Sequence, residues 1–214
     1  MNARIRPATR DDAAFLATVM LLASRSHLER GIWDLALQCT DAELLAFLEA
    51  FLASPDGHFC PYTGFLVAEV DGQRAAALSG YAHESKELTA PGEAIAATAA
   101  RVGRSGDDVK AMFTRMGPFL GCLPTDEPGA WIVEWVATRP EFRRRGLVDV
   151  LLRAELQVGR DRGHQIAQIM ILAGNVAAKH AYERVGFRVV EERLSADLEA
   201  AIGTPGLVRF LMPL

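Results

Sequence analysis

The feature that most constrains the fold of this chain is a strand that passes through an arginine-rich loop directly into an amphipathic helix. Residues 131–138 (WIVEWVAT) are apolar, β-branched or aromatic, which predicts a buried strand. The segment 147–162 is apolar at positions on one face of a helix, and Gly163 stands where that helix should end. Residues 165–172 (QIAQIMIL) predict a second buried strand. This alternation favours a mixed α/β sheet with helices on its faces.

The N-terminal part predicts a strand and two capped helices. Residues 3–6 form a short strand, and Thr9 with Asp12 makes a capping-box-like pair before the apolar helix 13–23. Thr40 and Glu43 form a capping box before a second helix, which the sequence SPDG at 54–57 ends.

The remaining elements follow from turns and periodicity. Asp71-Gly72 predicts a hairpin between strands 64–70 and 74–82. The C-terminal third predicts a short helix at 175–185 and strands at 187–194 and 207–211.

Between the hairpin and the strand at 131 lies a stretch rich in glycine and proline. Gly117-Pro118 and Pro128-Gly129 break it into pieces, of which 93–102 and 107–116 have helical patterns. We interpret 84–129 as a helical insertion within one domain that spans residues 1–214. Six apolar side chains of this insertion are candidates to line a pocket, to contact a second subunit or to pack on the sheet: Ile95, Val102, Val109, Met112, Phe113 and Met116.

Composition narrows the class of partner. The 214 residues are 50% hydrophobic and 23% charged, with a formal net charge of −4, so neither nucleic acid nor a membrane is expected as a partner. The three cysteines form no CxxC pair and no His/Cys/Asp cluster has metal spacing, so we expect no disulfide framework and no metal. No targeting segment stands out, and we expect a cytoplasmic protein.

The arginine-rich loop is a candidate pyrophosphate-binding site. Arg139, Arg143, Arg144 and Arg145 precede Gly146, where the helix begins. Unpaired N–H groups at a helix start bind phosphate, and arginines pair with its remaining oxygens. A solvated basic turn is the alternative interpretation. The patterns GxxxxGK[ST] and GxGxxG are both absent, which argues against a P-loop or a dinucleotide-binding domain.

Two stretches resemble motifs of the GNAT superfamily of acetyl-CoA-dependent N-acetyltransferases. The sequence VATRPEFRRRGLVDVLL is similar to its motif [QR]xxGx[GA], with Arg143, Gly146 and Val148 at the matching positions. The sequence NVAAKHAYERVGF, residues 175–187, resembles its next segment, N-x-x-[AS]-x-x-x-Y-E-x-x-G-F. Val148 departs from the usual glycine or alanine, and we expect its larger side chain to crowd the helix start and weaken CoA binding.

The resemblance implies a fold and a cofactor site. The fold is a central mixed, mostly antiparallel sheet in which the parallel strands 131–138 and 165–172 splay apart around acetyl-CoA. The implied CoA-binding residues are Val136, Ala137 and Thr138 along the pantetheine arm, Arg143, Arg144, Arg145, Gly146, Leu147 and Val148 around the pyrophosphate, and Asn175 on the pantetheine. Asn175 is equally placed to cap the helix that follows it.

Acetyl transfer to an amine needs an acid for the leaving thiolate and a base for the amine. The resemblance places Tyr182 near the sulfur as the acid, with packing on the sheet as the alternative. Glu134 is the candidate base because a carboxylate among apolar neighbours has a raised pKa, with a polar face or an arginine partner as the alternative. His83 is a second candidate base, and the backbone near Val136 offers an N–H for the oxyanion.

The implied function is N-acetylation of a small-molecule or peptide amine by direct attack in a ternary complex. A non-catalytic acyl-CoA-binding domain is the alternative, and a homodimer is left open. The segment 24–37 (SRSHLERGIWDLAL) should wall the acceptor site. Within it, Glu29 and Asp34 are candidates to hold a cationic amine, and Trp33 either stacks on that amine or is buried in the core.

Overall fold

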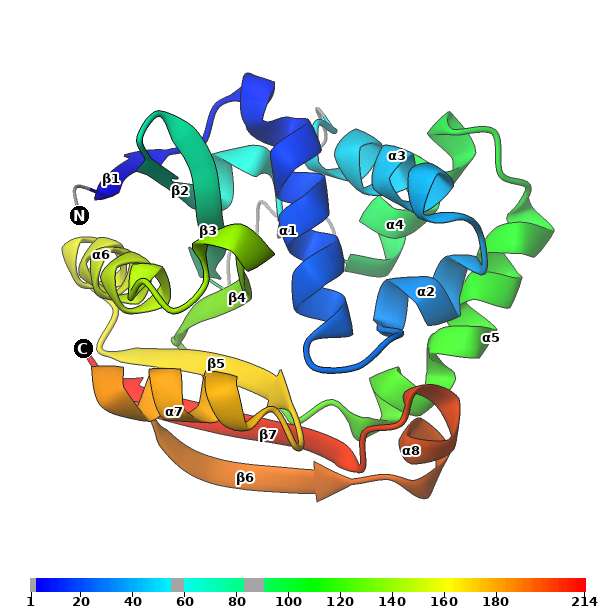
Figure 1. Ribbon diagram of the computed structural model, residues 1–214. Helices are drawn as coiled ribbons and strands as arrows, with labels where there is room; N and C mark the ends of the chain where they lie inside the picture. The colour runs from blue at the N-terminus through cyan, green and yellow to red at the C-terminus, as the bar shows by residue number, and fades with distance from the viewer. Residues whose placement is uncertain (1–2, 55–59, 83–90) are drawn as a thin grey trace.

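The computed structural model describes residues 3–54, 60–82 and 91–214 and contains a seven-stranded, mostly antiparallel sheet (Figure 1). The strand order is β1-β2-β3-β4-β5-β7-β6, and only β4 and β5 pair in parallel. The strands are β1 (Ala3–Pro7), β2 (Phe65–Val70), β3 (Gln73–Ala82), β4 (Trp131–Thr138), β5 (Ile166–Leu172), β6 (Arg188–Leu194) and β7 (Gly206–Pro213). The predicted fold class and the strands on which it depends are confirmed.

Helices cover both faces of this sheet. They are α1 (Ala13–Arg25), α2 (Ile32–Leu37), α3 (Asp41–Leu52), α4 (Pro91–Arg101), α5 (Gly106–Cys122), α6 (Leu147–Asp161), α7 (Val176–Val185) and α8 (Ala196–Ile202). Within the three described ranges, no helix is both long and apolar enough to cross a bilayer.

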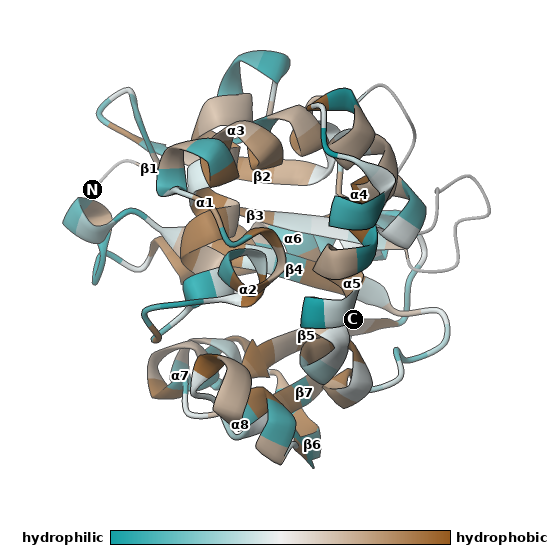
Figure 2. Cartoon of the chain, turned by 90° about the vertical axis from the view of Figure 1, so that its right-hand side faces the viewer, coloured by the Kyte–Doolittle hydropathy of each residue, from teal (hydrophilic) through white to brown (hydrophobic). Residues whose placement is uncertain are grey.

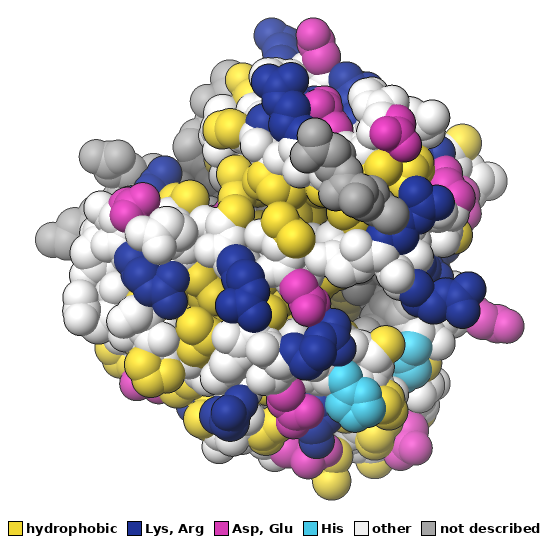
Figure 3. All heavy atoms as spheres, turned by 60° about the vertical axis from the view of Figure 1, so that its left-hand side comes forward, with side chains coloured by type: hydrophobic (Ala, Val, Ile, Leu, Met, Phe, Trp, Pro, Cys, Tyr) yellow, Lys and Arg dark blue, Asp and Glu magenta, His cyan; other side chains and the backbone are white. Residues whose placement is uncertain are grey.

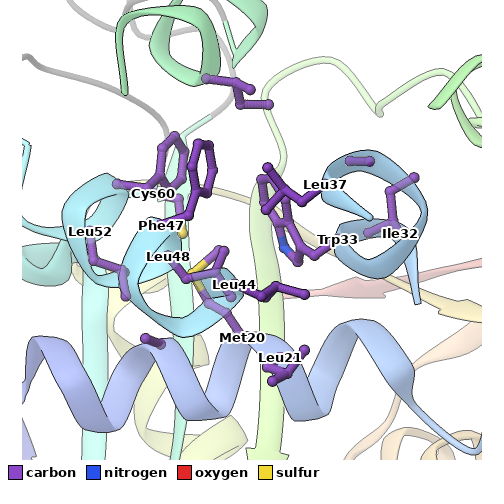
Figure 4. Packing of buried hydrophobic residues seen from close by; sticks show 14 of the residues in the cluster. Met20, Leu21, Ile32, Trp33, Leu37, Leu44, Phe47, Leu48, Leu52 and Cys60 are labelled. Atoms are coloured by element: carbon purple, nitrogen blue, oxygen red, sulfur yellow. The ribbon is translucent and has the colours of Figure 1, made fainter. Parts of the chain in front are cut away.

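Two hydrophobic clusters lie on opposite faces of the sheet. One cluster contains side chains from each of the helices α1, α2, α3, α4 and α5. Within it, the Trp33 ring packs between Phe47 of α3 and Trp135 of β4. Figure 4 shows Trp33 and Phe47 in this cluster. The other joins the sheet to α6 and α7. Figure 2 shows the hydrophobic faces of the helices turned inward toward the sheet, the pattern expected of amphipathic helices on a sheet.

The predicted caps and turns form as expected. The backbone N–H of Thr40 donates to Glu43 Oε2 at 2.9 Å, and the Glu43 N–H donates back to the Thr40 hydroxyl at 3.4 Å. Asp71 and Gly72 both have positive φ, 51° and 75°, as a tight hairpin turn requires. The turn predicted at 54–57 extends into residues outside the described ranges.

Two short helices were not predicted. Helix α2 lies in the segment 24–37, for which the sequence predicted no helix, and its N-terminus is held by the Gly31 N–H donating to Asp34 Oδ2 at 2.8 Å. A Cβ on Gly31 would lie 2.2 Å from the Ser24 carbonyl oxygen, so this close approach requires glycine. Helix α8 begins at Ser195, whose hydroxyl accepts from the Leu198 N–H at 3.2 Å. Both helices are too short to show a clear apolar period.

The stretch predicted as an insertion forms the helices α4 and α5. The expectation that Gly117-Pro118 ends the second helix is wrong, because α5 continues to Cys122. Proline leaves the carbonyl four residues earlier without a donor, and this carbonyl belongs to Thr114, an exposed residue whose carbonyl water can reach. The side chain of Arg115 donates to the Leu35 carbonyl at 3.1 Å and to that of Ala36 at 2.9 Å, which fastens α5 to the end of α2.

Helix α6 carries a buried carboxyl group that predicts a pH-dependent stability. Glu155 is 2% exposed and accepts from the Trp131 indole N–H at 3.0 Å. Burial raises the pKa of Glu155 to about 7, against the opposing effects of Trp131 and the Arg162 charge. Because this pKa is raised on folding, the proton stabilises the native state at low pH, and that stability is lost as pH rises from the ordinary value of 4.5 through 7.

Replacing Glu155 with glutamine should therefore remove this loss. Glutamine keeps the acceptor for Trp131 but does not ionise. We expect Glu155→Gln to gain about 2–3 kcal/mol in free energy of unfolding over the wild type between pH 4.5 and pH 8. Urea unfolding across this pH range measures the difference. A difference that stays constant with pH would show that Glu155 keeps an ordinary pKa.

Candidate functional site

A cavity of about 880 Å³ runs from the arginine-rich loop, between strands β4 and β5, to the helices of the insertion. Its lining includes the loop residues Arg143 to Asp149, Val136 to Thr138 of β4, Ile169 to Leu172 of β5, and Asn175 and Tyr182 of the α7 region. The structure thus brings together every residue of the predicted catalytic and cofactor-binding set: Glu134, Val136, Ala137, Thr138, Arg143, Arg144, Arg145, Gly146, Leu147, Val148, Asn175 and Tyr182.

The cavity exists because β4 and β5 separate after a short parallel pairing. They pair only at Trp131, Ile132 and Val133 of β4, although both strands continue. The pairing of β3 with β4 shifts register between Ala77 and Ser79, opposite Trp135, whose φ is 53°. Such a bulge adds one residue to β4 and increases its twist, which turns the second half of β4 away from β5.

The separation leaves backbone donors of β4 facing the cavity. The N–H of Arg139 donates to Ala75 of β3 at 2.9 Å. Because N–H groups alternate in direction along a strand, those of Val136 and Thr138 point to the opposite side, toward β5. No β5 residue pairs with β4 at this level. These two N–H groups are therefore available to a ligand in the cavity.

At the other end of the cavity, the start of α6 is built to receive an anion. Gly146 is the N-cap residue with φ of 72°, and no side chain caps the helix. The first-turn N–H groups of a helix have no intrahelical partner, and those of Leu147, Val148 and Asp149 have this position. Asp149 would oppose an anion here, but it pairs with Arg184 at 2.9 Å, which offsets its charge.

The arginines of the loop are exposed and only partly engaged. Arg143 Nε donates to the Thr138 carbonyl at 3.3 Å, and Arg145 donates to the Glu141 carbonyl at 3.2 Å. The Arg145 guanidinium also lies 5.2 Å from the centre of the Phe142 ring. On the face seen in Figure 3, Lys and Arg side chains stand in small groups among acidic and hydrophobic ones.

Asn175 has the structural role that its position indicated. It is the N-cap of α7, where Oδ1 accepts from the Ala178 N–H at 3.0 Å, and Nδ2 donates to the Ser26 hydroxyl at 2.6 Å. Because the side chain also lines the cavity, its role in capping does not exclude contact with a ligand.

Tyr182 is a buried side chain at the wall of the cavity. It is 5% exposed, and its ring packs against Phe187 and Phe210 at centroid distances of 6.2 and 6.1 Å. Burial raises the pKa of this phenol well above its ordinary value of 10. The group therefore stays protonated at neutral pH. The Tyr182 side chain therefore both packs in the core and forms part of the cavity wall.

Glu134 lies at the end of the cavity remote from the loop. Burial and, to a smaller extent, nearby Asp126 raise the pKa of Glu134 to about 7, against the opposing effects of the Tyr81 hydroxyl and the Trp135 indole. Tyr81 also lines the cavity, and its own pKa is raised by burial and by the two carboxylates. A carboxyl group with a pKa near neutrality can take a proton and return it at physiological pH.

Three buried polar atoms among the described residues have no hydrogen-bond partner: Glu134 Oε2, Trp33 Nε1 and Trp135 Nε1. All three residues line this one cavity. A buried polar atom without a partner costs free energy unless water or a ligand bonds to it. These atoms thus mark the part of the cavity that is built to receive a polar group.

The segment between α1 and α3 contributes less than expected. Trp33 is 2% exposed and lines the cavity, so it is both buried and accessible from inside. Asp34 pairs with Arg25 at 2.7 Å, and neither Asp34 nor Glu29 lines the cavity, so the prediction that they hold an amine is wrong. The second candidate base, His83, lies outside the described residues.

Among the cavity residues that were not recognised from the sequence, Tyr81 and Asp126 lie beside Glu134. Tyr81 stands opposite Ile132 in the β3–β4 pairing, so it shares a face with Glu134 two residues further on. Asp126 accepts a hydrogen bond from the Gln168 amide, which places a loop residue of the insertion beside β5. Alternation along 74–82 could have placed Tyr81, whereas nothing in the sequence indicates where Asp126 lies.

Comparison with known proteins places this geometry among acetyltransferases. A family model described as the acetyltransferase (GNAT) family matches residues 33–187. An N-acetyltransferase structure from Staphylococcus aureus Mu50 is 18% identical with a TM-score of 0.65, covering 99% of this chain and 100% of the other. A polyamine N-acetyltransferase of Drosophila melanogaster is 19% identical with a TM-score of 0.57, covering 100% of both chains.

A third similar structure, yncA from Salmonella typhimurium with its cofactor acetyl-CoA, is 17% identical with a TM-score of 0.54 and covers 100% of this chain and 95% of the other. At these identities the structures share a fold. No protein with a curated description matches the sequence.

Proposed function

The chain belongs to the GNAT acetyltransferase family, and from this we propose that it transfers an acetyl group from acetyl-CoA to a primary amine, by direct attack in a ternary complex. The observation that carries the proposal is the continuity of one cavity. It joins an uncapped helix start beside three arginines to a buried carboxyl group with a pKa near 7, past a pair of separated strands.

The residues present fit acetyl-CoA. Gly146 has a positive φ, and no atom lies within 4 Å of the position where a Cβ would stand, so the phosphate side of the loop is open. Arg143, Arg144 and Arg145 would hold the pyrophosphate oxygens together with the α6 N–H groups. The free N–H of Thr138 and the side chain of Asn175 would hold the pantetheine arm. Val148 is half-buried against the second cluster and keeps its backbone N–H at the helix start.

Acetyl-CoA, when bound, supplies an activated thioester. The chain's own groups would supply the base, the hydrogen-bond donor for the oxyanion and the acid. The carboxylate of Glu134 would take a proton from the amine, directly or through water. The Val136 N–H would donate to the oxygen on which negative charge develops. The Tyr182 hydroxyl would donate its hydrogen to the departing sulfur.

A non-catalytic acyl-CoA-binding domain would use the arginine loop but would have no need of a buried carboxyl group with a raised pKa at the acceptor end. Glu155 has a similarly raised pKa but lies outside the cavity, whereas Glu134 lines the cavity with an unpartnered oxygen, and this placement favours a catalytic role. Our proposal also includes one domain over residues 1–214 and a cytoplasmic location, which is supported by three cysteines that form no disulfide in the described structure.

Coenzyme A and acetyl-CoA should stabilise the protein, and ATP should not. At one hundred times Kd a ligand adds about 2.7 kcal/mol, which corresponds to a rise of about 5–10 °C in Tm. Arg143→Glu should abolish this rise, because the reversed charge repels phosphate at an exposed loop position. Thermal unfolding with each ligand measures the effect.

Arg153→Glu is the matched control, since Arg153 is exposed on α6 and does not line the cavity. This variant should keep the full ligand-induced shift, and both variants should keep the unliganded Tm. An equal shift with CoA and ATP, or none with either, would contradict the proposed cofactor.

A further inference from the structure

We propose that the acceptor is a primary amine carried by an uncharged, apolar body, such as an alkylamine or an arylalkylamine, and that diamines and amino acids are poor acceptors. This inference rests on the proposed acetyl transfer and specifies its substrate class. It depends on how charge is distributed along the acceptor half of the cavity.

The acceptor half of the cavity is walled by apolar side chains from three separate parts of the chain. Helices α1 and α2 supply one side and the insertion supplies the other. The apolar residues that face this space are Leu22, Ile32, Ile95, Met116, Phe119, Leu120, Leu123 and Pro124. Apolar surface of this extent gains free energy by covering an apolar ligand body.

The two carboxylates of this half stand together at one end. Ser79 pairs with Glu134 and Tyr81 with Ile132, so the Tyr81 and Glu134 side chains share a face of the sheet. Asp126 is close enough to both groups to shift their pKa upward. The unpartnered Oε2 of Glu134 is an acceptor, so it matches the hydrogens of a single ammonium group.

Beyond this end, the described lining offers no charge to a second polar group. Its charged residues are Asp126, Glu134, Arg143, Arg144, Arg145, Asp149 and Arg184. The last five belong to the arginine loop, the start of α6 and α7, at the cofactor end. A second ammonium on the acceptor would therefore meet no acidic side chain there, and a carboxylate would meet only the neutral indole N–H groups of Trp33 and Trp135, so neither charge would be offset.

The apolar wall is fixed in place rather than left to adapt. Arg115 bonds α5 to two carbonyls of α2. At the far end, Arg193 donates to the Leu123 carbonyl at 2.8 Å, and the Glu127 N–H donates to Gln168 Oε1 at 2.8 Å. These bonds tie the insertion to β6 and β5. Because α5 is held at Arg115 and the chain just after it is held at Leu123 and Glu127, this part of the wall presents a preformed apolar surface to the acceptor.

Three acceptors of equal length test the inference: hexylamine, diaminohexane and aminohexanoate, which differ only in the group at the far end. Free thiol is followed at saturating acetyl-CoA, and kcat/KM is compared at one pH. We expect hexylamine to exceed each of the other two by about 10²-fold or more, because only its far end is uncharged.

Leu120 offers a gain-of-function test. It lines the cavity from α5 and is 42% exposed, so a polar side chain there is compatible with folding. Leu120→Asp places a carboxylate in the apolar wall and should lower the hexylamine-to-diaminohexane ratio at least about tenfold. Leu120→Asn is the matched control of equal size without charge, and its ratio should remain close to that of the wild type.

Equal or better use of diaminohexane by the wild type would overturn the inference. So would acetyl-CoA binding with no turnover of any alkylamine, because that result removes the acceptor class and leaves the cofactor site standing. Failure to bind acetyl-CoA would instead overturn the proposed function. The two failures are separated by measuring acetyl-CoA binding in the absence of any acceptor.

Discussion

Replacing Glu134 with glutamine is expected to lower kcat/KM for the amine by about 10²–10³-fold, the effect typical of losing a general base. Glutamine keeps the size of the side chain and its carbonyl acceptor, so the protein should fold and bind acetyl-CoA as before. What it loses is the ability to take a proton from the attacking amine. Steady-state kinetics with free-thiol detection measures the change.

The pH dependence of kcat/KM is a more specific test of the role of Glu134. Since burial and Asp126 raise the pKa of this carboxyl group to about 7, the wild-type kcat/KM should rise as pH increases through 7, where the group becomes a carboxylate. This limb should be absent in Glu134→Gln.

Glu155→Gln is the matched control. Glu155 is also a buried glutamate with a pKa raised to about 7, but it does not line the cavity. This variant should retain the limb near pH 7. A limb that survives in Glu134→Gln, or that disappears in Glu155→Gln, would exclude Glu134 as the base.

Replacing Tyr182 with phenylalanine is expected to lower kcat by about 10²-fold, with little change in acetyl-CoA binding. The expected loss lies at the low end for a general acid, because a strongly raised pKa makes full proton transfer to sulfur unfavourable. The phenol then acts mainly by donating a hydrogen bond to the departing thiolate. The ring contacts with Phe187 and Phe210 should persist, so stability should change little.

Tyr62→Phe is the control for the loss of a hydroxyl group. Tyr62 is half-buried against the first cluster and does not line the cavity. Its variant should keep wild-type turnover. Unchanged turnover in Tyr182→Phe with a good acceptor would assign Tyr182 a packing role alone.

Much of the fold could be predicted because local signals agree with tertiary structure. The β4 strand, the α6 helix and the Asp71-Gly72 turn each have a strong pattern, and each appears at the predicted residues. The limits of α5 could not be predicted, because the cost of Pro118 inside a helix falls when the carbonyl that it frees is open to water. That condition depends on which side of α5 faces solvent.

The cofactor half of the site could be predicted from the sequence because its residues are contiguous along the chain. The acceptor half could not be predicted in this way. Tyr81, Asp126 and Trp135 come from three segments that only strand register and the fastening of the insertion bring together. Asp34 was misassigned because its ion-pair partner could not be identified from the sequence. That partner is Arg25, nine residues earlier, whose positive charge offsets the charge of Asp34.

The central claim is that this cavity moves an acetyl group from acetyl-CoA to an amine. Mass spectrometry of a reaction with acetyl-CoA and hexylamine, with free thiol counted in the same sample, tests it most directly. We predict N-acetylhexylamine and free thiol in equal amounts, and neither above background with Glu134→Gln. Thiol release without the N-acetylated amine would contradict it, and so would the absence of thiol release from protein that binds acetyl-CoA, with hexylamine and with a panel of other primary amines.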